Sequence, residues 1–151
     1  MTRADDTAGC VFCIADTIGD GHELVVHQGQ LAYVILNKFP YNAGHLMVVP
    51  FRHVAQLARL ERDALNEMAA LTQLCERVLT EAYAPQGINV GMNLGRPAGA
   101  GIVDHLHIHL VPRWNGDTNF MTVVGEVRVL PEELPQTATR LRPLFKKLSS
   151  L

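Results

Sequence analysis

The sequence lacks several features that would each define a class of protein. It holds three cysteines among 151 residues, too few for the disulfide framework of a small secreted domain. No apolar run approaches the roughly 20 residues that a membrane helix needs, and residues 1–6 lack the apolar core of a signal peptide. We therefore expect a cytoplasmic protein without a membrane partner.

An excess of charge of one sign is also missing. Lysine and arginine number 13 against 15 aspartates and glutamates, which gives a formal net charge of -2. Proteins that read nucleic acid usually carry a basic surplus, so we expect no nucleic-acid partner and only local phosphate binding. The hydrophobic share of 48% over this length suits one compact domain with a substantial core.

Three short runs rich in β-branched and aromatic residues come first along the chain. Residues 24–28 and 31–37 are separated by Gln28-Gly29-Gln30, which suits a tight turn and predicts a hairpin. Residues 38–44 contain proline, asparagine and glycine, which favour turns. They lead into His45–Phe51, so we expect three consecutive strands.

The spacing of apolar residues changes in the middle of the chain. From Glu61 to Ala84 they recur every three or four residues, which predicts one long helix with an apolar face. Cys75 lies on that face and is interpreted as a buried packing residue. Pro85-Gln86-Gly87 ends the helix, and further strands are expected over Ile88–Leu94 and Leu106–Arg113.

The C-terminal part continues both patterns. Apolar residues alternate over 121–130, and residues 140–148 place basic side chains around an apolar stripe. The latter predicts an amphipathic helix, which we interpret as solvated or packed on a partner. Strands in runs around one main helix indicate an α+β fold with a mostly antiparallel sheet. We expect a single domain over residues 1–151, with a core at 10–114 and a C-terminal extension at 115–151.

A histidine triplet is the strongest chemical signal. His105, His107 and His109 alternate with apolar residues, so on a strand their imidazoles project from one face, about 6.6 Å apart. Imidazole can act as nucleophile, acid, base or metal ligand near neutral pH. Three on one face are hard to explain as packing, and we interpret this face as a reactive site.

A glycine-rich loop, residues 93–101, directly precedes the triplet. Glycine lets backbone amides approach a ligand closely, and consecutive amides form a concavity that binds anions. We therefore expect the loop to hold phosphate beside the imidazoles. It lacks the Gly-Lys-Ser/Thr of a Walker loop and the context of a dinucleotide fingerprint.

The triplet is part of a longer pattern. Residues 105–111 match the signature His-φ-His-φ-His-φ-φ of the histidine-triad (HIT) family, where φ is apolar. Other segments resemble that family in the same order along the chain: Asn37-Lys38-Phe39-Pro40, Gly44 to Pro50, Asn93-Leu94-Gly95 and Pro112-Arg113-Trp114. The sequence is identified as a member of that family. The resemblance implies a HIT-like fold with a five-stranded sheet, one long helix and a C-terminal tail.

The resemblance also implies a chemistry. A nucleotidyl hydrolase or transferase of this kind acts at an α-phosphate through a covalent nucleotidyl-histidine, without an organic cofactor. His107 would be the nucleophile, since covalent catalysis splits one hard displacement into two easier ones. His109 would hydrogen-bond the phosphate oxygens. The residues implied to bind substrate are Asn37 at the ribose, Asn93, Gly99, Ala100 and Gly101 at the phosphates, and Trp114.

A second site involves the cysteines near the start. Cys10 and Cys13 have zinc-knuckle spacing, and a tetrahedron needs two further ligands. Zinc-containing members of the resembled family supply them from a histidine after the third strand and from the first histidine of the triad, here His53 and His105. We expect a structural zinc site, with no open position for catalysis. The alternative is a pair of reduced, partly buried thiols.

The segment Pro112–Phe120 resembles the branch that contains diadenosine polyphosphate hydrolases and diadenosine tetraphosphate phosphorylases. In the loop before the triad, hydrolases of the fragile-histidine-triad type carry glutamine and phosphorylases carry serine, whereas this chain has Gly101. We predict hydrolysis of a dinucleoside polyphosphate, with phosphorolysis or phosphoramidase activity as alternatives.

Two hypotheses from other classes stay open: a hydrolase whose three histidines bind a catalytic zinc, and a nucleotide-binding module without turnover. The resemblance also implies a homodimer in which two sheets join and the tail after Trp114 closes over the pocket.

Overall fold

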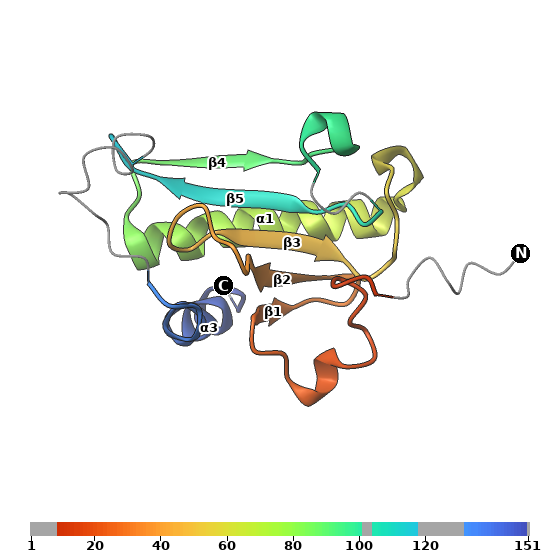
Figure 1. Cartoon of the computed structure of the whole chain (residues 1–151). Coiled ribbons are helices and arrows are strands. Elements are labelled where there is room, and N and C mark those ends of the chain that lie inside the picture. Colours follow the sequence, from red (N-terminus) through yellow and green to blue (C-terminus); the bar gives the residue numbers. More distant parts are fainter. Residues whose placement is uncertain (1–8, 101–103, 118–131, 151) are drawn as a thin grey trace, which may run out of the picture.

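The computed structural model describes residues 9–100, 104–117 and 132–150. Its five strands form one antiparallel sheet in the order β1-β2-β3-β5-β4 (Figure 1). The strands are β1 (Val25–Gln28), β2 (Ala32–Leu36), β3 (Leu46–Pro50), β4 (Gly87–Gly91) and β5 (Ile108–Arg113). The expected α+β fold with a five-stranded antiparallel sheet is therefore confirmed.

The first hairpin forms where the sequence predicts it. Strands β1 and β2 pair around the turn at residues 29–31. The carboxylate of Glu67, on the long helix, accepts hydrogen bonds from the backbone amides of Gln30 and Leu31 at 3.2 and 2.6 Å. This side chain satisfies donors that the tight turn leaves unpaired, so the helix and the hairpin are fastened together.

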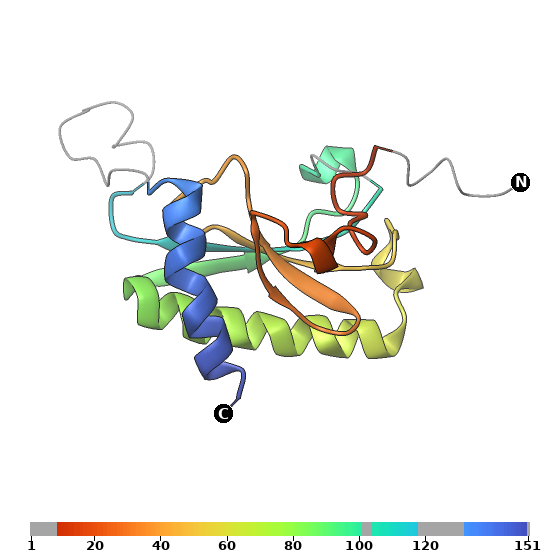
Figure 2. The same cartoon turned by 90° about the horizontal axis from the view of Figure 1, so that it is seen from below.

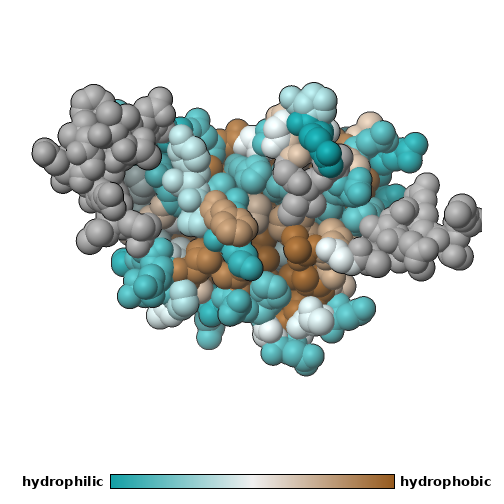
Figure 3. Space-filling view, viewed as in Figure 1, coloured by the Kyte–Doolittle hydropathy of each residue, from teal (hydrophilic) through white to brown (hydrophobic). Residues whose placement is uncertain are grey.

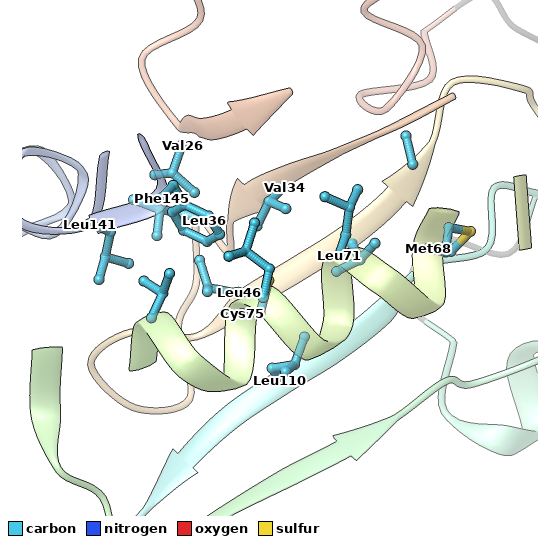
Figure 4. Close-up of a cluster of buried hydrophobic side chains, with 14 of the residues drawn as sticks. Val26, Val34, Leu36, Leu46, Met68, Leu71, Cys75, Leu110, Leu141 and Phe145 are labelled. Carbon is cyan, nitrogen blue, oxygen red and sulfur yellow. The ribbon is translucent and has the colours of Figure 1, made fainter. Parts of the chain in front are cut away.

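The long helix α1 (Arg62–Tyr83) covers one face of the sheet (Figure 2). Its buried residues form the apolar stripe predicted from their spacing, and Cys75 is fully buried within it (Figure 4). The helix ends where Ala84 adopts a left-handed conformation and donates its amide to the carbonyl of Thr80, directly before Pro85, which cannot continue the helix.

The C-terminal segment also forms a helix, α3 (Leu134–Leu148). Leu141 and Phe145 are fully buried, and they meet Val26 and Leu36 of the sheet (Figure 4). The predicted helix is thus confirmed, and it packs within this chain, against both α1 and β1. The guanidinium of Arg142 reinforces the contact, because it donates to the backbone carbonyls at residues 22, 23 and 25.

The opposite face of the sheet is covered by the N-terminal segment (Figure 2). Phe12 and Ile14 pack there against Tyr33, Ile35 and Met47. The Tyr33 hydroxyl donates to the carbonyl of Phe12 at 2.6 Å, which fixes the segment on the sheet. Here the sheet separates two apolar layers, so β2 and β3 are buried on both sides.

Two strand boundaries differ from prediction. Strand β5 begins at Ile108 rather than at residue 106, because the amide of Leu106 donates to the carbonyl of Val54, in the loop after β3. Strand β4 ends at Gly91 rather than at residue 94. Gly91, opposite His109, is the last residue that pairs with β5, and the residues after it lead into the glycine-rich loop. The alternation predicted over residues 121–130 lies outside the described residues.

Within the described residues, no helix is long and apolar enough to cross a membrane.

Replacing Phe145 with alanine tests whether α3 belongs to the core. The free energy of unfolding should fall by about 3–5 kcal/mol, because a fully buried ring leaves a cavity behind. Phe39→Ala is the matched control, because that ring is 82% exposed, and it should change stability by less than about 0.5 kcal/mol. Urea denaturation followed by circular dichroism measures both; equal effects would contradict the packing of α3 on the sheet.

Candidate active site and metal centre

A cavity of about 760 Å³ opens on the face of the sheet opposite α1. Its buried wall is apolar, from Phe12, Ile35 and Met47, and it also holds His107 and His109. The triad histidines lie on this face, where His105 and His107 contact Phe12 and His109 contacts His107. Only His109 is within β5, whereas the other two precede that strand. Leu106, Ile108 and Leu110 pack toward α1, as the alternation predicts. An apolar cavity with a few convergent polar groups is the usual form of a small-molecule site.

The orientation of His107 follows from one backbone contact. Its Nδ1 lies 3.0 Å from the carbonyl oxygen of His105. A carbonyl only accepts, so Nδ1 of His107 carries the proton and donates it. In the neutral ring, Nε2 then has a free lone pair. The ring is only 5% exposed and packs against the ring of Phe12, with centroids 4.9 Å apart.

His109 is oriented by a histidine that the sequence analysis did not assign to the site. Nδ1 of His45 accepts a hydrogen bond from the amide of Tyr41 at 3.1 Å, so in the neutral ring of His45 the proton is on Nε2. That nitrogen donates to Nδ1 of His109 at 2.9 Å. The remaining proton of His109 is therefore on Nε2, which becomes a donor.

His45 directly precedes β3, while His109 lies on β5. The two are 64 residues apart in the sequence, so no local spacing announces their contact. In the sequence, only the place of His45 within the segment Gly44 to Pro50, which resembles the HIT family, pointed to a role for this histidine.

Burial keeps these imidazoles neutral. It lowers the pKa of His107, and it lowers the pKa of His109 to about 4, with a further contribution from neighbouring His107. His45 is affected in the same way, with a pKa of about 4. Near neutral pH the site therefore offers an unprotonated nitrogen on His107 rather than an imidazolium.

Two backbone amides of the glycine-rich loop have hydrogen-bond partners within the loop itself. The amide of Gly99 donates to the carbonyl of Arg96 at 2.9 Å, and the amide of Ala100 donates to Gly95 at 3.2 Å. Both donors are used inside the loop, around the short 3-10 helix η4 (Arg96–Ala98). These two amides are therefore paired within the loop in this structure, and binding of phosphate by the loop stays a prediction.

The other predicted substrate residues are distributed as follows. Asn93 and Gly99 line the cavity, and the Asn93 side chain donates to the carbonyl of Gly99 at 3.4 Å. Ala100 is buried and does not line the cavity. Asn37 lines it, and its side-chain oxygen accepts the amide of Phe39 at 2.9 Å. Gly101 lies outside the described residues.

Trp114 is not brought to this cavity within one chain. It follows β5 at the end away from the histidines and borders a separate depression with Gln86 and Asn89. Asp117 organises this region, because it pairs with Arg113 at 2.9 Å and accepts the backbone amide of Trp114. The pairing holds the pKa of Asp117 at about 2.

The four residues predicted as zinc ligands do come together. The potential ligand atoms of Cys10, Cys13, His53 and His105 all lie within 4.8 Å of one another. Sγ of Cys10 and of Cys13 lie 3.5 and 3.6 Å from Nδ1 of His105, and Sγ of Cys13 lies 3.2 Å from Nδ1 of His53. Bonds of about 2.3 Å to sulfur and 2.0 Å to nitrogen at a tetrahedral angle place such atoms about 3.5 Å apart.

The surroundings of His105 also fit a metal ligand. Nε2 lies 2.7 Å from the carbonyl oxygen of Pro50, so it is the protonated nitrogen, and Nδ1 is left free toward the cysteines. The ring is fully buried. Burial, together with neighbouring Cys10, raises the pKa of the Cys13 thiol to about 11, and a cation among these ligands would favour the thiolate instead.

The HIT domain family model matches residues 20–116. The chain belongs to the HIT family. It is 48% identical over 120 residues to an AP-4-A phosphorylase of Mycobacterium tuberculosis, a match that covers 80% of this chain but 62% of that protein. It is 28% identical to a bis(5'-adenosyl)-triphosphatase of Dictyostelium discoideum, over 78% of this chain and 83% of the relative.

A solved structure supports the same assignment for this HIT chain. A zinc-bound histidine triad family protein of Mycobacterium smegmatis superimposes with a TM-score of 0.74 at 28% identity, covering 95% of this chain and 98% of that one. The family match ends at residue 116, so α3 lies beyond it.

The metal centre is tested by zinc content. Protein purified without chelators should contain about one zinc per chain, and Cys13→Ser should lose most of it, because a serine hydroxyl is a poor substitute for thiolate. Cys75→Ala is the matched control: this buried cysteine is outside the cluster, and the variant should keep its zinc. Elemental analysis beside thermal unfolding decides; a normally folded wild type with far less than one zinc contradicts the site.

Proposed function

We propose that this HIT protein cleaves dinucleoside polyphosphates at an α-phosphate, through a nucleotide bound covalently to His107. The observation that carries the proposal is the fixed tautomer of His107, which leaves a free Nε2 in the cavity. The relatives named AP-4-A phosphorylase and bis(5'-adenosyl)-triphosphatase support the substrate class.

In the first step, Nε2 of His107 attacks the α-phosphorus while the bond to the bridging oxygen breaks on the opposite side. The nucleoside polyphosphate leaves with that electron pair. The ring becomes positively charged, and its Nδ1–H, donated to the carbonyl of His105, stabilises the charge. Because burial keeps the ring neutral beforehand, no proton has to be removed before attack.

The neighbouring donors act on the phosphate oxygens. Nε2–H of His109 hydrogen-bonds a non-bridging oxygen as negative charge builds up there, and His45 holds His109 in the required tautomer. Asn93 supplies a further polar contact at the cavity edge. The nucleoside next to the reacting phosphorus occupies the apolar wall around Phe12 and Ile35.

In the second step, water attacks the phosphorus, the bond to Nε2 breaks, and the water gives up a proton to solvent. We keep water as the acceptor because Gly101 has no side chain to hold another acceptor. Phosphate is the second candidate, favoured by the 48% identity to the phosphorylase.

The Cys10, Cys13, His53 and His105 cluster would hold zinc as a structural ion. Four protein ligands leave no open position, so its contribution is to fix His105. The backbone of that same residue orients His107.

A homodimer is part of the proposal. Strand β4 is at the edge of the sheet, and its residues are largely exposed. An exposed edge is a template for pairing with another strand, which supports the joining of two sheets.

The product profile tests the acceptor. Diadenosine tetraphosphate is incubated with enzyme and excess phosphate, and nucleotides are separated by anion-exchange chromatography. Hydrolysis at an α-phosphate yields AMP and ATP. ADP and ATP as the products would overturn hydrolysis in favour of phosphorolysis, and the absence of any cleavage would favour a binding module without turnover.

The nucleophile is tested with His107→Ala. Turnover should fall on the order of 10³-fold or more, whereas the zinc content should be unchanged, because His107 is not in the metal cluster. Mass spectrometry of quenched wild-type enzyme should find a nucleotidyl adduct on His107. Loss of zinc in the variant would instead support a catalytic metal held by the triad.

A further inference from the structure

The most exposed large hydrophobic side chains of the described residues gather at the candidate active site. Phe39 is 82% exposed and Val11 is 61% exposed, the two highest values among them, and both line the cavity that holds His107. Single exposed hydrophobic residues are common on protein surfaces. Here, however, the two most exposed of these side chains, Phe39 and Val11, lie at the rim of the same cavity. Figure 3, which views the face opposite α1, shows hydrophobic surface across its middle, bordered by hydrophilic residues.

The loop that carries Phe39 is built to present it. The amide of Phe39 is bound to the side chain of Asn37, and Pro40 follows, which restricts the backbone of the preceding residue. The ring is therefore held at the rim by local contacts while it packs against little else. An aromatic ring with two side-chain torsions loses little entropy when a ligand covers it.

The neighbouring groups define the chemistry of that ligand. Lys38 also lines the cavity, so a cationic group and an exposed aromatic ring stand side by side at its edge. The inner wall, by contrast, is buried and apolar. This arrangement offers two separate places for bases, one inside the cavity and one at the rim, with a positive charge near the path between them. The volume of 760 Å³ is in the upper part of the range of about 300–1,000 Å³ for small-molecule sites.

We propose that Phe39 is the stacking platform for the second nucleoside of a dinucleoside polyphosphate, the one that leaves with the polyphosphate chain, and that Lys38 pairs with that chain. This inference rests on the proposed function for its substrate class. Stacking on an aromatic ring accepts any base, so this subsite selects for a second base without specifying which one.

The test compares two ligands that differ only in the second nucleoside, diadenosine tetraphosphate and adenosine 5'-tetraphosphate. Binding is measured by calorimetry in the inactive His107→Ala background. Adding Phe39→Ala should raise the dissociation constant of diadenosine tetraphosphate about 10-fold, within the range expected for one stacked base. The dissociation constant of adenosine 5'-tetraphosphate should change by less than about 2-fold. Phe39→Trp should preserve binding, whereas Phe39→Leu, which is apolar without an aromatic face, should behave like alanine.

Leu65→Ala is the matched control, because this leucine is also exposed but does not line the cavity. Equal weakening of both ligands by Phe39→Ala would assign the ring to the first base and overturn the proposal. A dimer that dissociates in Phe39→Ala, measured by sedimentation, would overturn it in favour of a second copy covering the ring.

Wild-type enzyme that cleaves diadenosine tetraphosphate normally while Phe39→Ala binds both ligands unchanged refutes the subsite alone. Wild-type enzyme that binds the dinucleotide through Phe39 but does not cleave it refutes the proposed reaction alone.

Discussion

The hydrogen bond between Nδ1 of His107 and the carbonyl of His105 is the contact on which the rest of the site depends. It decides which nitrogen of His107 is free. The side chain of His105, whose carbonyl accepts this hydrogen bond, lies among Cys10, Cys13 and His53. A shift of His105 would therefore disturb both the metal cluster and the orientation of the proposed nucleophile. Both sites depend on the position of this one residue.

Burial explains why three imidazoles can lie so close together. As cations, His45, His107 and His109 would repel one another, but loss of water lowers each pKa and keeps the rings neutral. Neutral rings can then alternate donor and acceptor along a chain from the backbone of Tyr41 to the cavity. Within the described residues, no buried side-chain nitrogen or oxygen lacks a hydrogen-bond partner.

The C-terminal helix connects the fold to the cavity. Phe145 anchors α3 in the core, while Arg142 holds the carbonyls of His22 and Glu23, two residues that also line the cavity. One cavity wall is thus fastened by a helix beyond the segment that the family model matches.

The sequence by itself determined the elements whose signals are local: the long helix from its three- and four-residue spacing, the strands from their composition, and the cysteine pair and histidine triplet from their own spacing. Only the tertiary structure decided that His45 orients His109, that the amides of Gly99 and Ala100 are already occupied, and that α3 packs on β1. The position of Trp114 outside the cavity of its own chain was likewise decided by the tertiary structure. The physical reason is that tautomers, amide partners and packing faces depend on atoms brought close by folding, such as those of His45 and His109, which stand 64 residues apart along the chain.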